Sequence, residues 1–352
     1  MIRPALLAAV AMPTMLQAQA FAADAVATPD PEQAEYVRVC DVYGPGFLYI
    51  PGTETCLRVG GYVRYDIGVG ENVGADVDGD GKGDTYYKRA RAALQTDARS
   101  QTEFGTLRAY SQINFDYDRG GSIWNYQDIS ATGDALYINH AYLELGGFRA
   151  GMTDSVFSTM TDYAGNVIND WLLRFGPFRT QQISYTYTAT NGLAATIALE
   201  AGSGLDVVKD YVPHVVAGAS LTQGWGRAMA VAAYDSVNDV WAGKARLDVD
   251  VTETISLFGM VGYKSEDEGR NYYGNWGGVW AVWGGGTAQI NEKARVNAQV
   301  AYDDDDNFLA IANVEYDLVE NFTITPEVLY TDNLINRGSD SIGGFLRLQA
   351  SF

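Results

Sequence analysis

The sequence has little cysteine and, beyond its first residues, no long apolar run. Cys40 and Cys56 are the only cysteines among 352 residues, and sixteen positions separate them. Zinc normally uses four ligands, and the two histidines, His140 and His214, lie far from the cysteines in the sequence, so the pair favours a disulfide over a metal site. After the amino terminus, no stretch approaches the roughly 20 apolar residues that a membrane-spanning helix needs.

Basic residues are also scarce. The chain has 24 Lys and Arg against 44 Asp and Glu, which gives a formal net charge of −20. Nucleic-acid binding depends on cations that neutralise phosphates, so this balance argues against a nucleic-acid partner. Glycine and aromatic residues are plentiful instead, with 39 Gly and 23 Tyr, and few stretches favour helix. This composition is typical of a protein built from β-strands.

The first residues have the features of an export signal. Arg3 precedes an apolar run that ends near Leu16, and small residues follow at Ala20 and Ala22. This order of a basic start, an apolar run and small residues is typical of a secretory signal peptide. We therefore predict a signal peptide over residues 1–22, with cleavage after Ala20 as the alternative. A buried N-terminal helix is less suitable, because nothing caps it.

Export bears on the cysteine pair, because disulfides persist in oxidising compartments outside the cytoplasm. A bridge between Cys40 and Cys56 would close a short loop, and the chain-entropy model assigns roughly 3 kcal/mol to a loop of this length. The sequence therefore predicts a structural disulfide in an exported protein.

Alternation of apolar and polar residues is the dominant pattern. Between 57 and 69, apolar Val63 and Ile67 alternate with polar Arg64 and Asp66. A period of two indicates strands with one apolar and one polar face. The pattern predicts about sixteen strands, over 57–69, 88–100, 105–117, 136–146, 148–157, 179–189, 193–202, 212–223, 226–237, 239–251, 254–265, 278–290, 293–302, 308–319, 321–332 and 341–352.

Short and long connections alternate between these strands. The connections 146–147 and 224–225 are tight, whereas 70–87 and 158–178 are long. A transmembrane barrel sorts its connections in this way, with short periplasmic turns and long extracellular loops. Unpaired backbone groups are not tolerated in lipid, so such a sheet must close. We predict an all-β, transmembrane antiparallel barrel that forms a single domain over 23–352.

Several segments resemble the alphaproteobacterial porin family. Residues 36–66, YVRVCDVYGPGFLYIPGTETCLRVGGYVRYD, are similar to its N-terminal signature, and 100–110 and 138–157 are similar to two further blocks. The last strand ends in Phe352, which resembles the insertion signal of outer-membrane barrels. The resemblance implies a trimeric, 16-stranded, water-filled channel of the outer membrane. It also implies a disulfide-closed segment over 36–56, fastened near the periplasmic base of the barrel.

The predicted function is passive diffusion of small hydrophilic solutes and ions, without enzymatic activity or a cofactor. The implied partners are these solutes, outer-membrane lipid and lipopolysaccharide, and two further copies in a homotrimer. A substrate-selective porin for sugars or charged oligomers is the alternative. An outer-membrane hydrolase fits less well, because neither His140 nor His214 has a nucleophile at a recognisable spacing. A TonB-dependent transporter would need a plug and about 22 strands, more than this length supplies.

The long connection 158–179 differs from the other long loops, because it carries apolar residues such as Val167 and Trp171. Water would not favour these side chains, whereas the inside of the barrel would, so we predict an inward-folded third loop that narrows the pore. Its acids would face arginines of the first strands and create a transverse field, although any one position could equally line the lumen elsewhere. The predicted constriction residues are Arg64, Arg89, Arg91, Arg108, Asp154, Asp162 and Asp170. The arginines favour anions and the total charge favours cations; we incline toward cations.

Two acidic clusters complete the set of candidate sites. The segment DVDGDGKGD resembles the start of an EF-hand loop, but its twelfth position is Tyr87, where such a loop needs a bidentate Glu. A solvated surface loop is therefore the preferred interpretation over a calcium site. The candidate calcium ligands would be Asp76, Asp78, Asp80 and Asp84. The run from Asp303 to Asp306 is expected to be a charged loop tip, with divalent bridging to lipopolysaccharide as the alternative.

Overall fold

The computed structural model describes residues 38–76, 82–119, 134–334 and 338–352. The predicted signal peptide, 1–22, lies outside these residues, and so do Asp78 and Asp80 of the calcium candidate. The described residues belong to one compact unit, Val37–Phe352.

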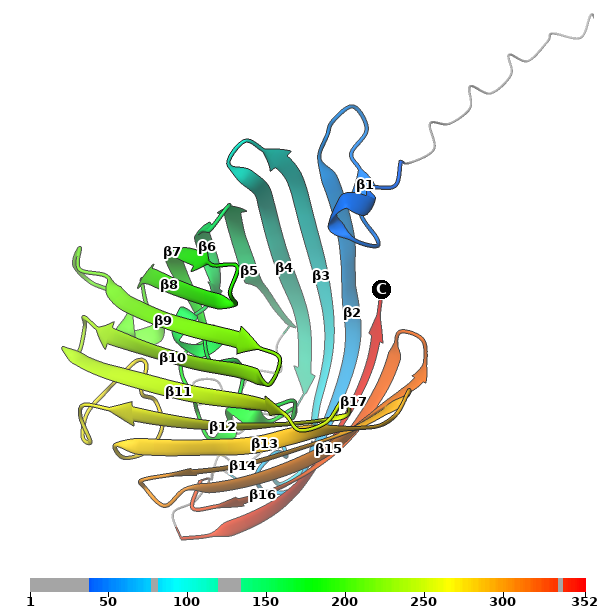
Figure 1. Ribbon diagram of the computed structural model, residues 1–352. Coiled ribbons are helices and arrows are strands. Elements are labelled where there is room, and N and C mark those ends of the chain that lie inside the picture. Colours follow the sequence, from blue (N-terminus) through cyan, green and yellow to red (C-terminus); the bar gives the residue numbers. More distant parts are fainter. Residues whose placement is uncertain (1–37, 77–81, 120–133, 335–337) are drawn as a thin grey trace, which may run out of the picture. The chain divides into compact units, whose positions relative to one another are not determined.

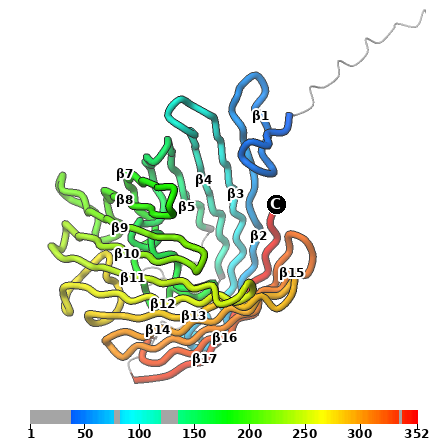
Figure 2. The backbone as a smooth tube through the Cα atoms, in the orientation of Figure 1, coloured from blue at the N-terminus to red at the C-terminus, as the bar shows by residue number. Residues whose placement is uncertain are grey.

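Within the described residues, sixteen long antiparallel strands and one two-residue strand form one sheet that closes on itself (Figures 1 and 2). Closure joins the last strand to the first long one, where Arg347 pairs in register with Asp66. The strands are β2 (Cys56–Val69), β3 (Tyr87–Thr102), β4 (Gly105–Arg119), β5 (Asp134–Leu145), β6 (Phe148–Asp154), β7 (Arg179–Thr188), β8 (Leu193–Glu200), β9 (His214–Gln223), β10 (Gly226–Asp235), β11 (Val240–Asp250), β12 (Ile255–Lys264), β13 (Trp280–Asn291), β14 (Ala294–Asp303), β15 (Phe308–Val319), β16 (Phe322–Asp332) and β17 (Asp340–Ser351).

The sequence predicted these sixteen strands, and the structure confirms the closed barrel. The largest difference is at β6, which ends at Asp154, three residues before the predicted end. The strand stops there because the Ser155 hydroxyl accepts a hydrogen bond from the Phe157 N–H and caps a short helix, α1 (Val156–Thr159). The sequence pattern missed β1 (Leu48–Tyr49), which pairs with the start of β2. A strand of two residues is too short to show alternation.

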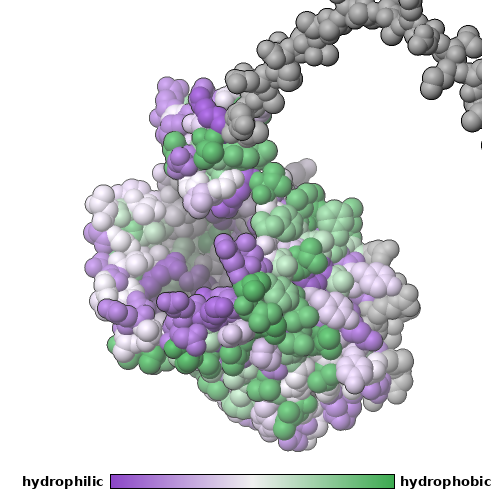
Figure 3. Space-filling model, turned by 90° about the vertical axis from the view of Figure 1, so that its right-hand side faces the viewer, coloured by the Kyte–Doolittle hydropathy of each residue, from purple (hydrophilic) through white to green (hydrophobic). Residues whose placement is uncertain are grey.

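The two faces of the sheet have opposite polarity. Apolar Val63 and Phe115 point outward and are exposed, whereas polar Asp66 and Asn114 are buried on the inner side. Figure 3 shows one face, where hydrophobic residues gather beside a hollow bordered by hydrophilic ones. An apolar outside and a polar inside are the reverse of a soluble protein and suit a wall between lipid and water. Among the described residues, no helix is long and apolar enough to cross a bilayer.

Short and long connections lie at opposite ends of the barrel, as predicted, except that the short connections 236–239 and 304–307 lie at the long-loop end. At the end where β2 begins and β17 finishes, tight turns join the strands, and one of them places Gly146 at φ 59°. Glycine adopts this left-handed conformation without steric cost. The long connections leave from the other end, and the longest that the structure describes in full is 155–178, between β6 and β7.

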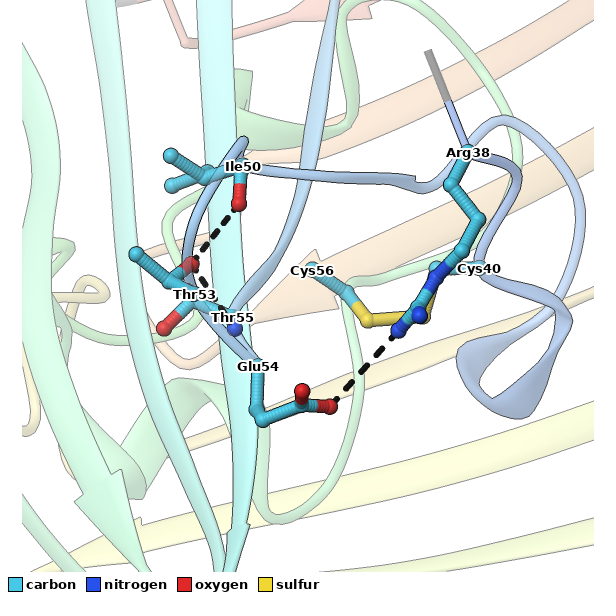
Figure 4. The surroundings of a disulfide bond; sticks show 7 residues. All are labelled: Arg38, Cys40, Ile50, Thr53, Glu54, Thr55 and Cys56. Carbon is cyan, nitrogen blue, oxygen red and sulfur yellow. Dashed lines mark hydrogen bonds and ion pairs between the residues drawn. A yellow bond between two sulfur atoms is a disulfide. The ribbon is translucent and has the colours of Figure 1, made fainter. Parts of the chain in front are cut away.

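The predicted disulfide is present between Cys40 and Cys56 (Figure 4), with a Cα–Cα distance of 6.0 Å. Both cysteines are buried beside Phe47, and the Cys40 N–H donates to the Phe47 carbonyl at 2.8 Å. An exposed ion pair between Arg38 and Glu54, 3.6 Å apart, lies near the bridge. The bridge ties the segment before β2 to the first residue of that strand, at the end with the short turns.

Candidate functional site

The connection 155–178, here called the inner loop, lies inside the barrel. Its apolar residues form the main buried cluster of the described chain, where Phe157 and Leu173 pack together with wall residues such as Trp283. The hydrophobic effect thus favours the inward position of the loop. The predicted inward-folded third loop is confirmed, with its limits at 155 and 178 instead of 158 and 179.

A buried carboxylate holds the first end of the inner loop. Glu200, at the end of β8, accepts hydrogen bonds from the Ser155 hydroxyl at 2.7 Å and from the Val156 N–H at 2.8 Å. The Tyr273 hydroxyl donates to the same carboxylate at 3.1 Å. Glu200 is only 1% exposed, so these donors replace the water that the carboxylate loses.

A second buried carboxylate holds the middle of the inner loop. Glu327 of β16 accepts from the Ile168 N–H at 2.5 Å, and from the Asn169 N–H at 3.2 Å and side-chain amide at 2.8 Å. The Asn313 side chain on β15 donates to Glu327 at 3.0 Å. Hydrogen bonds to an ionised acceptor are about twice as strong as neutral ones, so this contact fixes the loop firmly.

A buried lysine and a tryptophan hold the returning part of the loop. The Lys244 ammonium on β11 donates to the Phe175 carbonyl at 2.6 Å and lies 4.6 Å from the centroid of the Phe157 ring. The Trp283 indole on β13 donates to the Leu173 carbonyl at 3.2 Å. Lys244 is 3% exposed, and the loop carbonyl and the ring together replace its hydration. Glu200, Glu327 and Lys244 are the three anchors of the inner loop.

The three predicted acids occupy different surroundings. Asp162 forms an ion pair with Arg227 of β10 at 2.8 Å, and Asp154 accepts a hydrogen bond from the Tyr163 hydroxyl at 2.6 Å. Asp170 is half-buried, and desolvation together with nearby Glu327 raises its pKa to about 8. None of the three pairs with the predicted arginines among the described residues.

Three of the predicted arginines lie together on the opposite wall. Arg89 of β3 binds Asp66 of β2 at 2.6 Å, and Arg91 binds Asp116 of β4 through two hydrogen bonds of 2.6 Å. Arg64 donates two hydrogen bonds, of 2.9 and 2.7 Å, to Gln349 of β17. Asp66 also accepts from Arg347 at 2.8 Å. These side chains form a ladder of alternating charges across β17, β2, β3 and β4, here called the charged wall.

Arg108 does not belong to the same level of the pore. It lies in register with Arg99, eight residues along β3 from Arg91, which is roughly 27 Å at about 3.4 Å per residue. Arg108 binds Asp97 at 3.0 Å and Glu144 at 2.9 Å, close to the short-turn end. The predicted arginine cluster is therefore divided into two groups.

The inner loop contacts one side of the barrel and leaves the other open. Its hydrogen bonds and ion pairs to other elements go to β6, β8, β10, β11, β13, β15 and β16. None of these contacts joins 155–178 to a residue of β2–β5. The side of the barrel without these contacts therefore includes the charged wall.

The alternation assigned the predicted arginines to the inward face of the sheet, but it did not indicate their partners or the loop anchors. A polar residue at an inward position was recognisable for Asp66, Lys244 and Arg347 from the alternation. Which of these side chains meets the loop depends on contacts between residues far apart in the chain, such as Asn169 and Glu327. No local pattern encodes that contact.

The calcium candidate is described only in part. Asp76 is buried and Asp84 exposed in the connection 70–86, where Ala75 and Thr85 form a β-bridge. In the described ranges, no three His, Cys, Asp or Glu side chains gather as metal ligands would. The preferred interpretation, a solvated surface loop, stays a prediction, with a calcium site as the alternative.

Comparison with known proteins adds independent information. The model of the family described as "Porin subfamily" matches residues 24–343. Porin Omp2a of Brucella melitensis biotype 1 is 46% identical, and Porin Omp2b of Brucella abortus is 44% identical; in each case 94% of both chains is covered. Among solved structures, the outer membrane channel DcaP of Acinetobacter baumannii matches with a TM-score of 0.66 and 18% identity, over 86% of this chain and 99% of that one. An anion-selective porin from Comamonas acidovorans matches with a TM-score of 0.57 and 12% identity, over 85% and 100%.

Proposed function

Since this chain belongs to the family described as the Porin subfamily and is an outer-membrane diffusion porin, we propose that its pore runs between the inner loop and the charged wall. Small hydrophilic solutes and ions cross through this gap without covalent chemistry. Selectivity then depends on the charges that border the gap, because low-dielectric walls concentrate their field.

The observation that carries the proposal is the one-sided attachment of the inner loop. Three buried anchors tie it to β8, β11 and β16, and its backbone donors and carbonyls are used in these contacts. A loop held in this way narrows the lumen permanently and leaves the charged wall uncovered. The narrowing is therefore a fixed constriction and not a gate.

The constriction proposal assigns a role to each predicted residue. Arg64, Arg89 and Arg91 border the gap on the charged wall, and Arg64 contributes uncompensated positive charge because its partner is the neutral Gln349. On the loop side, Asp170 contributes a charge that depends on pH. Asp154 and Asp162 act as braces of the loop through Tyr163 and Arg227, and Arg108 lines the periplasmic exit.

The mature porin is proposed to be a homotrimer that starts after residue 22. The outward surface of β2 and β3 supports a subunit contact, because small exposed residues such as Ala90 and Ala92 allow close approach of a flat partner surface. Lipopolysaccharide is proposed to contact the long loops at the other end. Chemical cross-linking and N-terminal sequencing of protein from native membranes test the trimer and the cleavage site.

Planar-bilayer recording tests the pore itself. Purified protein should give stepwise, ohmic conductance in KCl, and an Arg64→Gln variant should shift the reversal potential in a salt gradient toward cations. Protein that inserts but conducts no ions would contradict the channel, and an unchanged reversal potential would contradict the role of Arg64.

A further inference from the structure

The long-loop end of the barrel holds a cavity of about 840 Å³ that the contacts described above do not fill. Its lining comes from the returning part of the inner loop and from the connections 201–213 and 265–279. We propose that this cavity binds small organic anions in which a carboxylate or phosphate is attached to a flat apolar skeleton. Its volume lies in the range of ligand pockets, about 300 to 1,000 Å³.

Unpaired positive charge supports an anionic ligand. Arg174 and Arg179 both line the cavity and are exposed. Neither forms an ion pair with an acidic residue in the described part of the chain, and Arg179 instead lies with its guanidinium 4.7 Å from the centroid of the Tyr137 ring. A guanidinium presents planar donors that match a carboxylate or phosphate with two parallel hydrogen bonds.

The other cations of the cavity already have partners. Arg270 binds Asp206, the cavity's acidic lining residue, at 2.6 and 3.0 Å. The buried Lys264 ammonium donates to the Trp276 carbonyl at 2.9 Å. Arg270 and Asp206 thus compensate each other, and the charge available to a ligand comes mainly from Arg174 and Arg179.

Aromatic rings support a flat apolar skeleton. Phe178 lines the cavity and stacks on Tyr163 with an interplanar angle of 14°, which holds its ring in place. Tyr272 is held in a similar way by stacking on His214, with ring centroids 5.3 Å apart. Ring faces that are fixed before binding cost little entropy when a planar ligand stacks on them.

The paired arginines of the charged wall do not offer the same site. There the guanidinium groups of Arg89 and Arg91 are occupied by Asp66 and Asp116. An incoming anion would have to displace a carboxylate that is already bound through short hydrogen bonds. The cavity is therefore where organic anions are retained before they reach the constriction. The proposal rests on the proposed diffusion function, because retention matters only if solutes enter this mouth.

The test is ion-current recording on the protein in a planar bilayer with benzoate as the probe. Benzoate added on the long-loop side should reduce the KCl current of the wild type in a saturable manner, whereas neutral benzamide should not. In the double variant Arg174→Gln, Arg179→Gln, the benzoate concentration for half-block should rise at least about tenfold. Lys209→Gln removes an exposed charge from the 201–213 connection outside the cavity and should leave the block unchanged.

Two further variants separate the parts of the proposal. Arg174→Lys, Arg179→Lys keeps the charge and should retain most of the block, and Phe178→Ala should weaken block by benzoate more than block by acetate. Equal benzoate block in the wild type and the glutamine variant would overturn the cavity site, and so would equal block by benzoate and benzamide. A wild type without any conductance would instead contradict the diffusion function.

If the Arg174→Gln, Arg179→Gln variant does not insert into the bilayer, tryptophan fluorescence tests benzoate binding to the cavity instead. Trp276 lines the cavity, so wild-type protein in detergent should show saturable quenching with benzoate that benzamide does not reproduce. Equal quenching by the two compounds would overturn the proposal.

Discussion

The two sides of the lumen use buried charge in different ways. On the charged wall, acids and arginines of neighbouring strands bind one another on the inner face of the sheet, as Arg91 and Asp116 do. On the covered side, Glu200, Glu327 and Lys244 have no oppositely charged partner in the described chain and bind groups of the inner loop instead. Charged residues that pair with one another within the sheet therefore line the pore. Charged residues that bind the inner loop instead hold it in the position where it narrows the pore.

Removal of a loop anchor should have the largest effect on the single-channel conductance. In Glu327→Ala, the Ile168 and Asn169 N–H groups lose their acceptor, and each hydrogen bond to a charged group is worth about 1.5–3 kcal/mol. We expect the inner loop to detach and the single-channel conductance and current noise to rise. The control Glu200→Gln leaves the middle of the loop attached and should change conductance less. Unchanged conductance in Glu327→Ala would show that the loop does not narrow the pore.

Removal of an arginine from the charged wall should have the next largest effect, on both stability and ion selectivity. Arg91→Gln leaves Asp116 buried without its cation, at a cost of about 3 kcal/mol. We expect a lower unfolding temperature and a shift of the reversal potential toward cations. Asp116→Asn should shift it toward anions, and the double variant should recover part of the stability. Additive losses in the double variant would mean that the two side chains are not coupled.

The disulfide belongs neither to the charged wall nor to the covered side of the lumen. Its removal therefore serves as a control that should change stability but not conductance. Replacement of Cys40 and Cys56 by serine should lower the stability by up to about 3 kcal/mol, without a change in conductance. Proteolysis of the segment before β2, followed by gel electrophoresis, should be faster in the variant. A changed conductance would mean that this segment takes part in the pore.

Asp170 should make the covered side sensitive to pH. Its pKa is about 8 in the folded protein, above the ordinary value of 3.8, so the folded state binds the proton more tightly than the unfolded state. The contribution of Asp170 to loop attachment is therefore largest below about pH 4 and is lost as the pH rises through about 8, where the pore also gains a negative charge. Cation selectivity should rise between pH 7 and 9 in the wild type, and Asp170→Asn should abolish this step.

The ion pair between Asp162 and Arg227 should have the smallest effect. Both side chains are partly exposed, and pairs of this kind contribute about 0–1 kcal/mol. Arg227→Gln should thus leave conductance and unfolding temperature nearly unchanged. A large loss of stability would place this pair among the loop anchors.

Alternation along the chain was sufficient to predict the strands, because every residue of a barrel wall faces either lipid or lumen. It also identified Val167 and Trp171 as apolar residues that a loop in water would not keep. It could not predict which side of the lumen the loop covers, since Lys244 and Arg89 are both basic residues at inward positions of alternating strands. The division depends on the path of the inner loop, which is decided by contacts as distant as Asn169 with Glu327.

Cysteine labelling tests the central claim most directly, because the natural cysteines are both in the disulfide. Gln95 lies on β3, at the open side of the lumen. Gln299 lies on β14 beneath the inner loop: it is 1% exposed, and a Cβ atom added to Gly165 of the loop would lie 3.7 Å from its Oε1 atom. A charged, water-soluble thiol reagent should reduce the current through Gln95→Cys and leave Gln299→Cys unaffected. Equal labelling of both positions, or block only through Gln299→Cys, would contradict a pore between the inner loop and the charged wall.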